Sequence, residues 1–177
     1  MGLISVFDSS VLINLIEKEH SEFGLKANHV YHFLKRNKVE IVYTNDVKIE
    51  VLRKSTEKMN EFLNSHRQIP YFVGIRSWDE IEATWDDLGS VFNDNGEEHI
   101  DIIKYLKRTE RSLDDGILND AICYGVDIFV HFNSKDFKRI PNDFWKKYRV
   151  LNMDLKSLSI EEIEIELNRL FENGKER

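Results

Sequence analysis

The sequence is poor in cysteine and has no long apolar run, and each shortage excludes a class of protein. Cys123 is the single cysteine, so the chain holds neither an internal disulfide nor a zinc site with several cysteine ligands. No apolar run approaches the roughly 20 residues of a membrane-spanning helix. The first residues also lack the basic segment and cleavage pattern of a secretory signal. We therefore expect a cytoplasmic protein without membrane association.

Excess positive charge is absent as well. The net charge is −7, which excludes nucleic-acid binding through the overall field, because neutralising phosphates needs clustered Lys and Arg. Basic residues gather in four short groups, at residues 35–38, 53–58, 104–111 and 135–149. Most such groups are solvated surface, so contact with a polyanion has to be local.

What the sequence does contain is an alternation of short apolar runs with helical patterns. Its 177 residues fit one domain, with a core over about residues 3–153. Strands are expected at residues 4–7, 39–44, 126–132 and 149–153, and helices at 11–17, 28–36, 44–63, two within 77–112, 112–124 and 159–172. This order predicts an α/β fold: three layers, with a central, mainly parallel twisted sheet of four to five strands. We expect the helical segment 77–112 to cover part of the functional site.

Several helix ends are marked by capping residues. Thr44 or Asn45 is expected to cap the helix that follows the second strand. Ser159 and Glu162 form a capping box for the last helix. Gly125 is expected to end the helix before the most β-like run of the chain.

Acidic and amide side chains stand where the predicted elements end. Asp8 closes the first strand, and Glu50 lies one to two turns into the helix after the second. Asp114 stands in the first turn of the helix before the next strand, and Asn133 follows the end of that strand. The carboxyl ends of parallel strands share one edge, where α/β proteins keep their ligands. Converging carboxylates usually hold a cation, and oxygen ligands suit Mg²⁺ or Mn²⁺.

Three segments resemble the motifs of PIN-domain nucleases. ISVFDSSVLINLI, residues 4–16, is similar to the first motif: a strand ending in Asp, small polar residues and an apolar helix. TNDVKIEVLRK, residues 44–54, is similar to the helix that carries the conserved Glu of the family, here Glu50. Residues 114–140 resemble the final motif, in which an Asp-bearing helix leads through Gly to a strand and a DF pair. The resemblance spans about residues 3–140 and depends on the order of short motifs.

The final motif is matched with departures. Asn133 takes a position often held by Asp, His131 stands where Thr or Ser is usual, and Asp136 belongs to the DF pair. Three acids compete for the helix position: Asp114, Asp115 and Asp120. Counting back from Gly125 without gaps favours Asp114 and places Ala121 on the small packing position of the family.

The resemblance implies a Mg²⁺- or Mn²⁺-dependent endoribonuclease that hydrolyses phosphodiester bonds of single-stranded or structured RNA. Small members are often toxins of toxin-antitoxin pairs, which implies a protein antitoxin or inhibitor and a homodimer as partners. The metal would be held by Asp8, Asp114 and either Asn133 or Asp136, with Glu50 orienting the attacking water or binding a second ion.

Substrate contacts are expected from residues that flank these acids. Ser10 is positioned to hydrogen-bond the scissile phosphate or a ligand carboxylate. Three basic residues are placed to hold the flanking RNA backbone: Lys135, Lys138 and Arg139.

Each acid also has a purely structural interpretation. Asp8 is a good helix cap, and Glu50 can pair with Lys54 one turn on. Asp114 complements the helix dipole, and Asp115 belongs to a capping box with Ser112. Asn133 and Asp136 are common turn formers.

Other functions compete with the nuclease. A haloacid-dehalogenase-type phosphotransferase needs a second acid two residues after Asp8, where Ser10 stands. A receiver-like phosphoacceptor needs an acidic pair and a late-strand Lys, which are not evident. The main alternative is a catalytically weak or inactive PIN-like module that binds nucleic acid or protein, because Asn133 replaces a carboxylate.

Overall fold

The computed structural model describes residues 2–53, 56–70, 113–137 and 140–173, and for residues 113–115, 134, 136 and 173 it describes only the backbone. The helical segment predicted at residues 77–112 lies outside these residues. Five strands form one sheet in the order β3-β2-β1-β4-β5, and every neighbouring pair is parallel. The strands are β1 (Ile4–Phe7), β2 (Glu40–Tyr43), β3 (Arg67–Gln68), β4 (Ile128–His131) and β5 (Leu151–Asp154).

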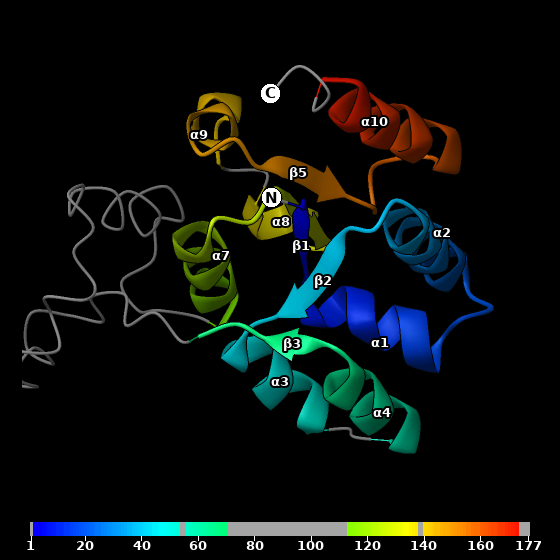
Figure 1. The fold of residues 1–177 in the computed structure, drawn as a ribbon. Helices are drawn as coiled ribbons and strands as arrows, with labels where there is room; N and C mark the ends of the chain where they lie inside the picture. The colour runs from blue at the N-terminus through cyan, green and yellow to red at the C-terminus, as the bar shows by residue number, and fades with distance from the viewer. Residues whose placement is uncertain (1, 54–55, 71–112, 138–139, 174–177) are drawn as a thin grey trace, which may run out of the picture.

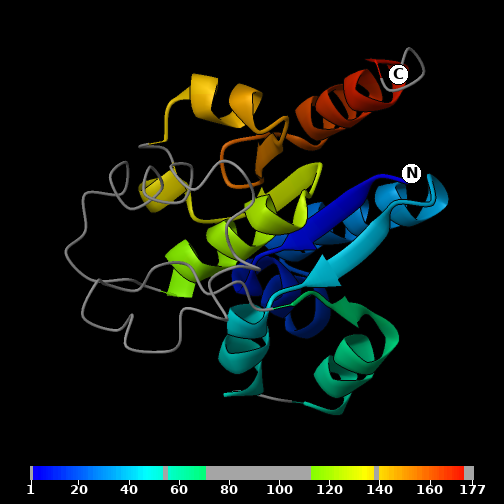
Figure 2. The same cartoon turned by 60° about the vertical axis from the view of Figure 1, so that its left-hand side comes forward.

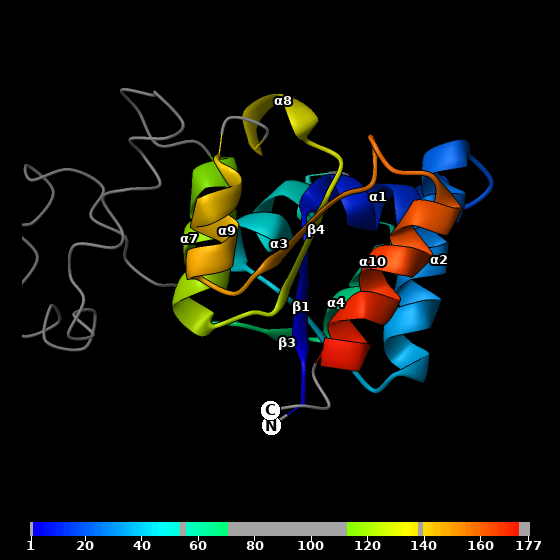
Figure 3. The same ribbon diagram turned by 90° about the horizontal axis from the view of Figure 1, so that it is seen from above.

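Helices flank this sheet on both faces. They are α1 (Ser9–Glu17), α2 (Glu22–Arg36), α3 (Asn45–Leu52), α4 (Glu57–Ser65), α7 (Leu113–Tyr124), α8 (Ser134–Phe137), α9 (Asn142–Lys147) and α10 (Ile160–Asn173). Seen from above, α7 and α9 lie on one side of β1, and α2 and α10 lie on the other (Figure 3). The expected α/β fold with a central parallel sheet is therefore confirmed.

The strand order spreads the helices along the sheet. Figure 1 shows α3 and α4 beside β3 at one end and α9 and α10 beside β5 at the other. The turned view in Figure 2 keeps the same separation, with α3 and α4 in cyan to green and α9 and α10 in orange to red. The central strand β1 lies between β2 and β4, so both of its edges are hydrogen-bonded.

The core packs against both faces of the central strands. Phe7 of β1 meets Tyr31 of α2 edge to face, with ring centroids 6.5 Å apart. Phe129 of β4 stacks with Trp145 of α9 at 6.2 Å and meets Phe137 edge to face at 5.2 Å. Burial on both faces explains why β1 and β4 appear in the sequence as short apolar runs without polar alternation.

The predicted element ends agree with the structure at three places. The side chain of Thr44 accepts a hydrogen bond from the backbone N–H of Val47 at 3.2 Å, so Thr44 caps α3. Gly125 follows α7 with a φ of +79°, the left-handed conformation that favours glycine. At α10, the backbone N–H of Ser159 donates to Glu162 at 2.8 Å and the N–H of Glu162 donates back to Ser159 Oγ at 3.2 Å.

Other expectations were wrong. The continuous helix expected over residues 44–63 is two helices, because α4 begins afresh with Thr56 accepting a hydrogen bond from the N–H of Met59. The turn formers Asn133 and Asp136 stand before and within the short helix α8, and α8, β3 and α9 were not predicted. The last strand extends one residue beyond Met153, to Asp154. No helix in the described part of the chain is long and apolar enough to span a bilayer.

Candidate functional site

Asp8 lies at the carboxyl end of β1, in the centre of the sheet. Its backbone N–H donates to the carbonyl of Val130 at 2.9 Å, which continues the pairing of β1 with β4 by one residue. It holds the N-cap position of α1 in an extended conformation, yet its side chain makes no cap hydrogen bond. Instead, Asp8 Oδ2 accepts a hydrogen bond from Ser10 Oγ at 2.5 Å. A capping role therefore does not account for this carboxylate, which is hydrogen-bonded instead by the hydroxyl of Ser10.

Burial makes the charge of Asp8 unfavourable. The residue is 2% exposed, and Oδ1 has no hydrogen-bond partner within the described ranges. Burial raises the pKa of Asp8 above its ordinary value, and the charge of Glu50 raises it further. The hydroxyl of Ser10 and the backbone N–H groups of Ser9 and Ser10 act in the opposite direction. An unpartnered buried carboxylate oxygen needs a proton or a cation, so this atom fits a metal ligand.

Glu50 is the second predicted acid that the structure brings to this place. It lies half-buried on α3, which packs against both α1 and α7. Its charge is close enough to act on the carboxyl group of Asp8. The alternative pairing with Lys54 lies outside the described residues. Two acids from different elements thus share one neighbourhood, although 42 positions separate them in sequence.

The acidic residues of α7 lie at two different distances from the carboxyl edge of the sheet. α7 leads through Gly125 into the start of β4, so its first turn, with the backbone of Asp114 and Asp115, points toward the carboxyl edge. Asp120 lies six residues further on, about 9 Å nearer the amino edge at 1.5 Å per residue. It is fully buried, and Asn119 Nδ2 donates to its Oδ1 at 3.5 Å. The geometry therefore favours Asp114 or Asp115 over Asp120 as a neighbour of Asp8.

The end of β4 brings the DF segment to the same edge. Asn133 is half-buried, and its carbonyl accepts the backbone N–H of Phe137 at 3.4 Å. Phe137 is buried against Phe129 and His131, which anchors α8 on the sheet. Lys135 on this helix is exposed. The side chain of Asp136 and residues 138–139, which include two of the predicted RNA contacts, lie outside the description.

The described side chains at this edge offer oxygen donors for a metal ion. Within them, no group of three or more His, Cys, Asp or Glu residues forms a metal cluster. Asp8 and Glu50 supply two carboxylates, and the unpartnered Oδ1 of Asp8 supplies a ligand atom of the kind that Mg²⁺ or Mn²⁺ prefers. The donor chemistry of Asp8 and Glu50 therefore fits a divalent cation.

Sequence analysis missed a second polar group beside this edge. His131 is 1% exposed, and its Nε2 atom is hydrogen-bonded to Asn152 Oδ1 at 2.8 Å. His131 pairs with Asp154 in the register of β4 and β5, so the three side chains belong to one small region. The alternation Asn152-Met153-Asp154 was the available signal. It was missed because the predicted strand ended at Met153.

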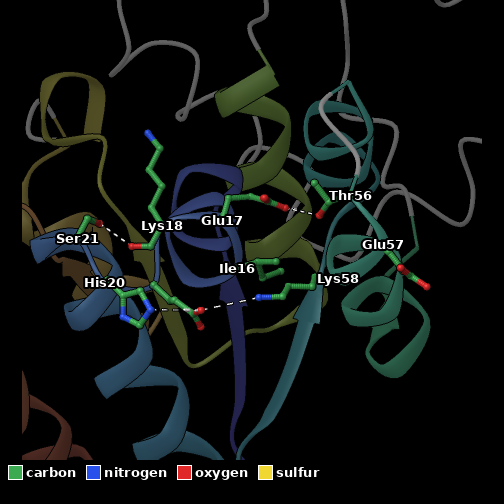
Figure 4. A pocket seen from close by; sticks show the side chains of 9 residues that line it. Ile16, Glu17, Lys18, His20, Ser21, Thr56, Glu57 and Lys58 are labelled. Carbon is green, nitrogen blue, oxygen red and sulfur yellow. Dashed lines mark hydrogen bonds and ion pairs between the residues drawn. The ribbon is translucent and has the colours of Figure 1, made fainter.

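A cavity of about 460 Å³ also lies between the end of α1 and the start of α4. Figure 4 shows its lining, where Thr56 donates to Glu17 and Lys58 pairs with Glu19 at 3.8 Å. These side chains are exposed and satisfy one another. The cavity lies about 12 Å along α1 from Asp8, taking 1.5 Å per residue, and it is separate from the carboxyl edge.

Comparison with known proteins gives a likeness of fold. No protein-family model matches the sequence, and no curated protein matches it. A similar solved structure is the crystal structure of VapBC2 from Rickettsia felis bound to a DNA fragment from their promoter. The TM-score is 0.52 at 19% sequence identity, and the alignment covers 85% of this chain and 97% of that chain. At this identity the likeness supports the α/β architecture with its parallel sheet.

Proposed function

We propose that the protein is a divalent-metal-dependent endoribonuclease that hydrolyses phosphodiester bonds of single-stranded RNA at the carboxyl edge of β1. The observation that carries the proposal is the buried Asp8 carboxylate, whose Oδ1 has no partner among the described residues and whose pKa is raised by burial and by Glu50. A carboxylate is costly in such a place unless a cation or a reaction needs it. The similarity of residues 3–140 to PIN-domain nucleases and the likeness of fold agree with this proposal.

Under this proposal each residue has a defined task. Asp8 holds Mg²⁺ or Mn²⁺ together with Asp114 and either Asn133 or Asp136. When bound, the ion lowers the pKa of a water molecule and offsets charge on the phosphate. Ser10 fixes one oxygen of Asp8 through the observed hydrogen bond, which leaves the other oxygen for the ion. Glu50 orients the attacking water.

We propose a single-stranded substrate because two aromatic rings lie at the end of β4 and the start of α2. Phe132 follows β4 directly, and the centroid of its ring lies 5.0 Å from that of Phe23 on α2. Phe23 is 37% exposed. Aromatic rings beside a nuclease site stack unpaired bases, which a duplex keeps inside its helix. Lys135 is exposed on α8 after the same strand and supplies a phosphate contact. A chain with a net charge of −7 needs such local contacts.

The second candidate function is a PIN-like binding module with little or no turnover. Asn133 favours it, since an amide replaces a carboxylate and lowers the negative charge available to a cation. The similar structure is of VapBC2 bound to promoter DNA, and by analogy we also propose a protein partner of the antitoxin kind. Exposed Ile49 and Leu52 on α3 and Ile165 on α10 are candidates for that contact or for a homodimer.

Cleavage of a labelled single-stranded RNA tests the proposal directly. We expect cleavage with Mn²⁺ or Mg²⁺ and none with EDTA. Asp8→Asn should lower the rate at least about 100-fold, because it removes a charged ligand of the ion. Asp143→Asn is the matched control, since Asp143 is 94% exposed on α9. Equal rates for wild type and Asp8→Asn would contradict the enzyme.

Calorimetry separates the two candidate functions. Uptake of Mn²⁺ by the wild type without RNA cleavage would support the binding module and contradict turnover. Mn²⁺ uptake that Asp114→Asn abolishes would support the proposed ligand set. Unchanged uptake would remove Asp114 from that set and return Asp115 as the candidate.

A further inference from the structure

A cavity at the carboxyl end of β4 and β5 combines a polar floor with aromatic walls. Its volume is about 460 Å³, within the range of about 300–1,000 Å³ that is usual for small-ligand sites. His131, Asn152 and Asp154 form the floor, and Phe137 and Trp145 stand among the walls. The cavity is separate from the one in Figure 4, where Glu17 accepts a hydrogen bond from Thr56 and Lys58 pairs with Glu19.

The floor lies on a sheet face that helices cover. Asp154 pairs with His131 and Asn152 with Phe129, and paired residues of parallel strands share a face. That face carries Phe137 of α8 and Trp145 of α9, both buried on Phe129. His131 is buried there, while Asn152 and Asp154 on the edge strand β5 are half-buried and line the cavity with it. Three polar side chains side by side on a covered face indicate a binding site.

The hydrogen bonds of the floor leave defined groups for a ligand. His131 Nε2 lies 2.8 Å from Asn152 Oδ1, and because an amide oxygen only accepts, the histidine donates this hydrogen bond. With Oδ1 engaged, Asn152 keeps its Nδ2 donor. Asp154 Oδ1 accepts the backbone N–H of Lys156 at 3.1 Å, which leaves Oδ2 and the second lone pair of Oδ1 as acceptors. The buried Nδ1 of His131 has no hydrogen-bond partner in the part of the chain that the structure describes.

We propose that this cavity binds a guanine base through its Watson–Crick edge. Guanine presents two adjacent donors, N1–H and the N2 amino group, which a carboxylate such as Asp154 accepts together. Its O6 atom lies beside them and accepts from an amide donor such as Asn152 Nδ2. Adenine, cytosine and uracil lack the two adjacent donors, so each would leave the carboxylate poorly matched. Trp145 and Phe137 also line the cavity, but both rings are almost fully buried on Phe129, so they give the base a small apolar contact and not a stacking platform.

Lys156 is placed to bind the phosphate of a nucleotide whose base occupies the cavity. It is exposed and lines the cavity, so its ammonium group is available to a phosphate. The cavity therefore offers a carboxylate and an amide for the base and a cation at the rim.

The cavity lies near Asp8 on the same edge of the sheet. β4 separates β5 from β1, so two strand spacings, about 10 Å, separate the floor on β5 from the strand that carries Asp8. A guanine within an RNA strand could occupy the cavity while the chain continues toward Asp8. This last link rests on the proposed function, whereas guanine binding itself does not.

Isothermal titration of the full chain in EDTA tests the proposal, since the chelator prevents cleavage. The probes are GMP, AMP, CMP and UMP, together with an oligouridine that carries one guanosine and one that carries none. We expect the guanine probes to bind at least about tenfold more tightly than their matched counterparts. Asp154→Asn should weaken their binding at least tenfold, because the second acceptor becomes a donor. Asp143→Asn should leave binding unchanged.

The probes distinguish the source of the base. Binding of GMP alone supports a site for free nucleotide, and binding of the guanosine-containing oligouridine supports a site for RNA. Equal affinity for all four nucleotides, or unchanged guanine binding in a folded Asp154→Asn variant, would overturn the proposal. If Asp154→Asn fails to fold, Asn152→Ser provides the same test through the loss of the O6 donor.

The outcome is independent of the nuclease test. Cleavage of RNA with Mn²⁺ together with no preference for guanine would overturn the guanine site and leave the nuclease intact. Guanine binding without cleavage would support the site and contradict the nuclease.

Discussion

Asp8 has a backbone that fits the sheet and a side chain whose charge is unfavourable in its buried position. The backbone of Asp8 continues the sheet through its hydrogen bond to Val130. Its carboxylate receives the Ser10 hydroxyl on one oxygen and has no partner for the other within the described chain. Burial and the charge of Glu50 both disfavour ionisation. The residue is thus suited to a bound cation and unfavourable without one.

The first prediction concerns stability without metal. In EDTA at pH 7, Asp8→Asn should raise the free energy of unfolding by about 0.5–2 kcal/mol, the usual gain from relieving an unfavourable functional group. Asparagine keeps an acceptor for Ser10 and removes the buried charge. Urea unfolding of both proteins measures the difference, and a variant less stable than the wild type would contradict it.

The pH dependence of this difference has a defined sign. The pKa of Asp8 is raised in the folded state, so the unfolded chain releases this proton at a lower pH than the folded chain. The wild type therefore loses stability as pH rises from the ordinary aspartate range toward the folded pKa, and the loss is complete above it. The advantage of Asp8→Asn should grow from pH 4.5 to pH 7 in the same unfolding measurements.

At the scale of elements, two glycines at helix boundaries are required for different physical reasons. α7 ends at Gly125 in a left-handed conformation, and a Cβ atom there would meet nothing within 4 Å. Gly24 is different, because a Cβ atom would lie 1.9 Å from the carbonyl oxygen of Lys18. The first glycine is needed for its backbone conformation and the second for the close approach of the chain before α2.

Gly125 gives a prediction with an internal control. Gly125→Ala should lower the free energy of unfolding by about 1–2 kcal/mol, because an L-residue is strained at this φ. Gly125→Asn should cost less, since asparagine tolerates the left-handed region. Urea unfolding of the three proteins gives the order, and equal losses for Ala and Asn would show that backbone strain is not the cause.

The sequence predicted elements well where periodicity and caps agree. β1, α7 and α10 were placed within two residues because apolar spacing and the residues Gly125 and Ser159 indicate the same boundaries. The break between α3 and α4 contains neither Gly nor Pro, so the pattern of apolar residues ran across it. β3 has two residues and α8 has four, too few for a periodic pattern. Their formation depends on tertiary contacts that one sequence does not display.

Part of the candidate site could also be predicted from the sequence. Asp8 and Glu50 were selected because strand ends and the following helices converge at one edge, and the structure brings them together. Asp154 was missed, since its place on the sheet depends on the pairing of β5 with β4. That Asp114 rather than Asp115 is the metal ligand stays a prediction. The position of α7 places both residues near the carboxyl edge but does not decide which of them faces Asp8.

At the scale of the whole molecule, the site joins elements from across the chain. Asp8 comes from the first strand, Glu50 from α3, and Asn133 follows β4. An ion held among them would link these elements and bind the folded state only. Metal binding should therefore stabilise the whole fold through mass action.

This coupling gives a prediction for metal addition and removal. Mn²⁺ at about 100 times its Kd should raise the free energy of unfolding of the wild type by about 2.7 kcal/mol, and EDTA should reverse the gain. Asp8→Asn should show little or no gain, while Asp143→Asn should behave like the wild type. Thermal melts with and without Mn²⁺ measure the effect. An equal gain in Asp8→Asn would place the ion elsewhere.

The pairing of β1 with β4 also has a consequence for the newly made chain. The side chain of Asp127, at the start of β4, accepts the backbone N–H of Ile4, 123 residues earlier. β1 is synthesised before β4, its neighbour in the sheet, and 121 positions separate Phe7 from Ile128. Contacts this far apart form late in folding. A growing chain on the ribosome therefore carries Asp8 before β4 has completed the edge at which Asp8 lies, so any activity that needs this edge begins only after β4 has been made.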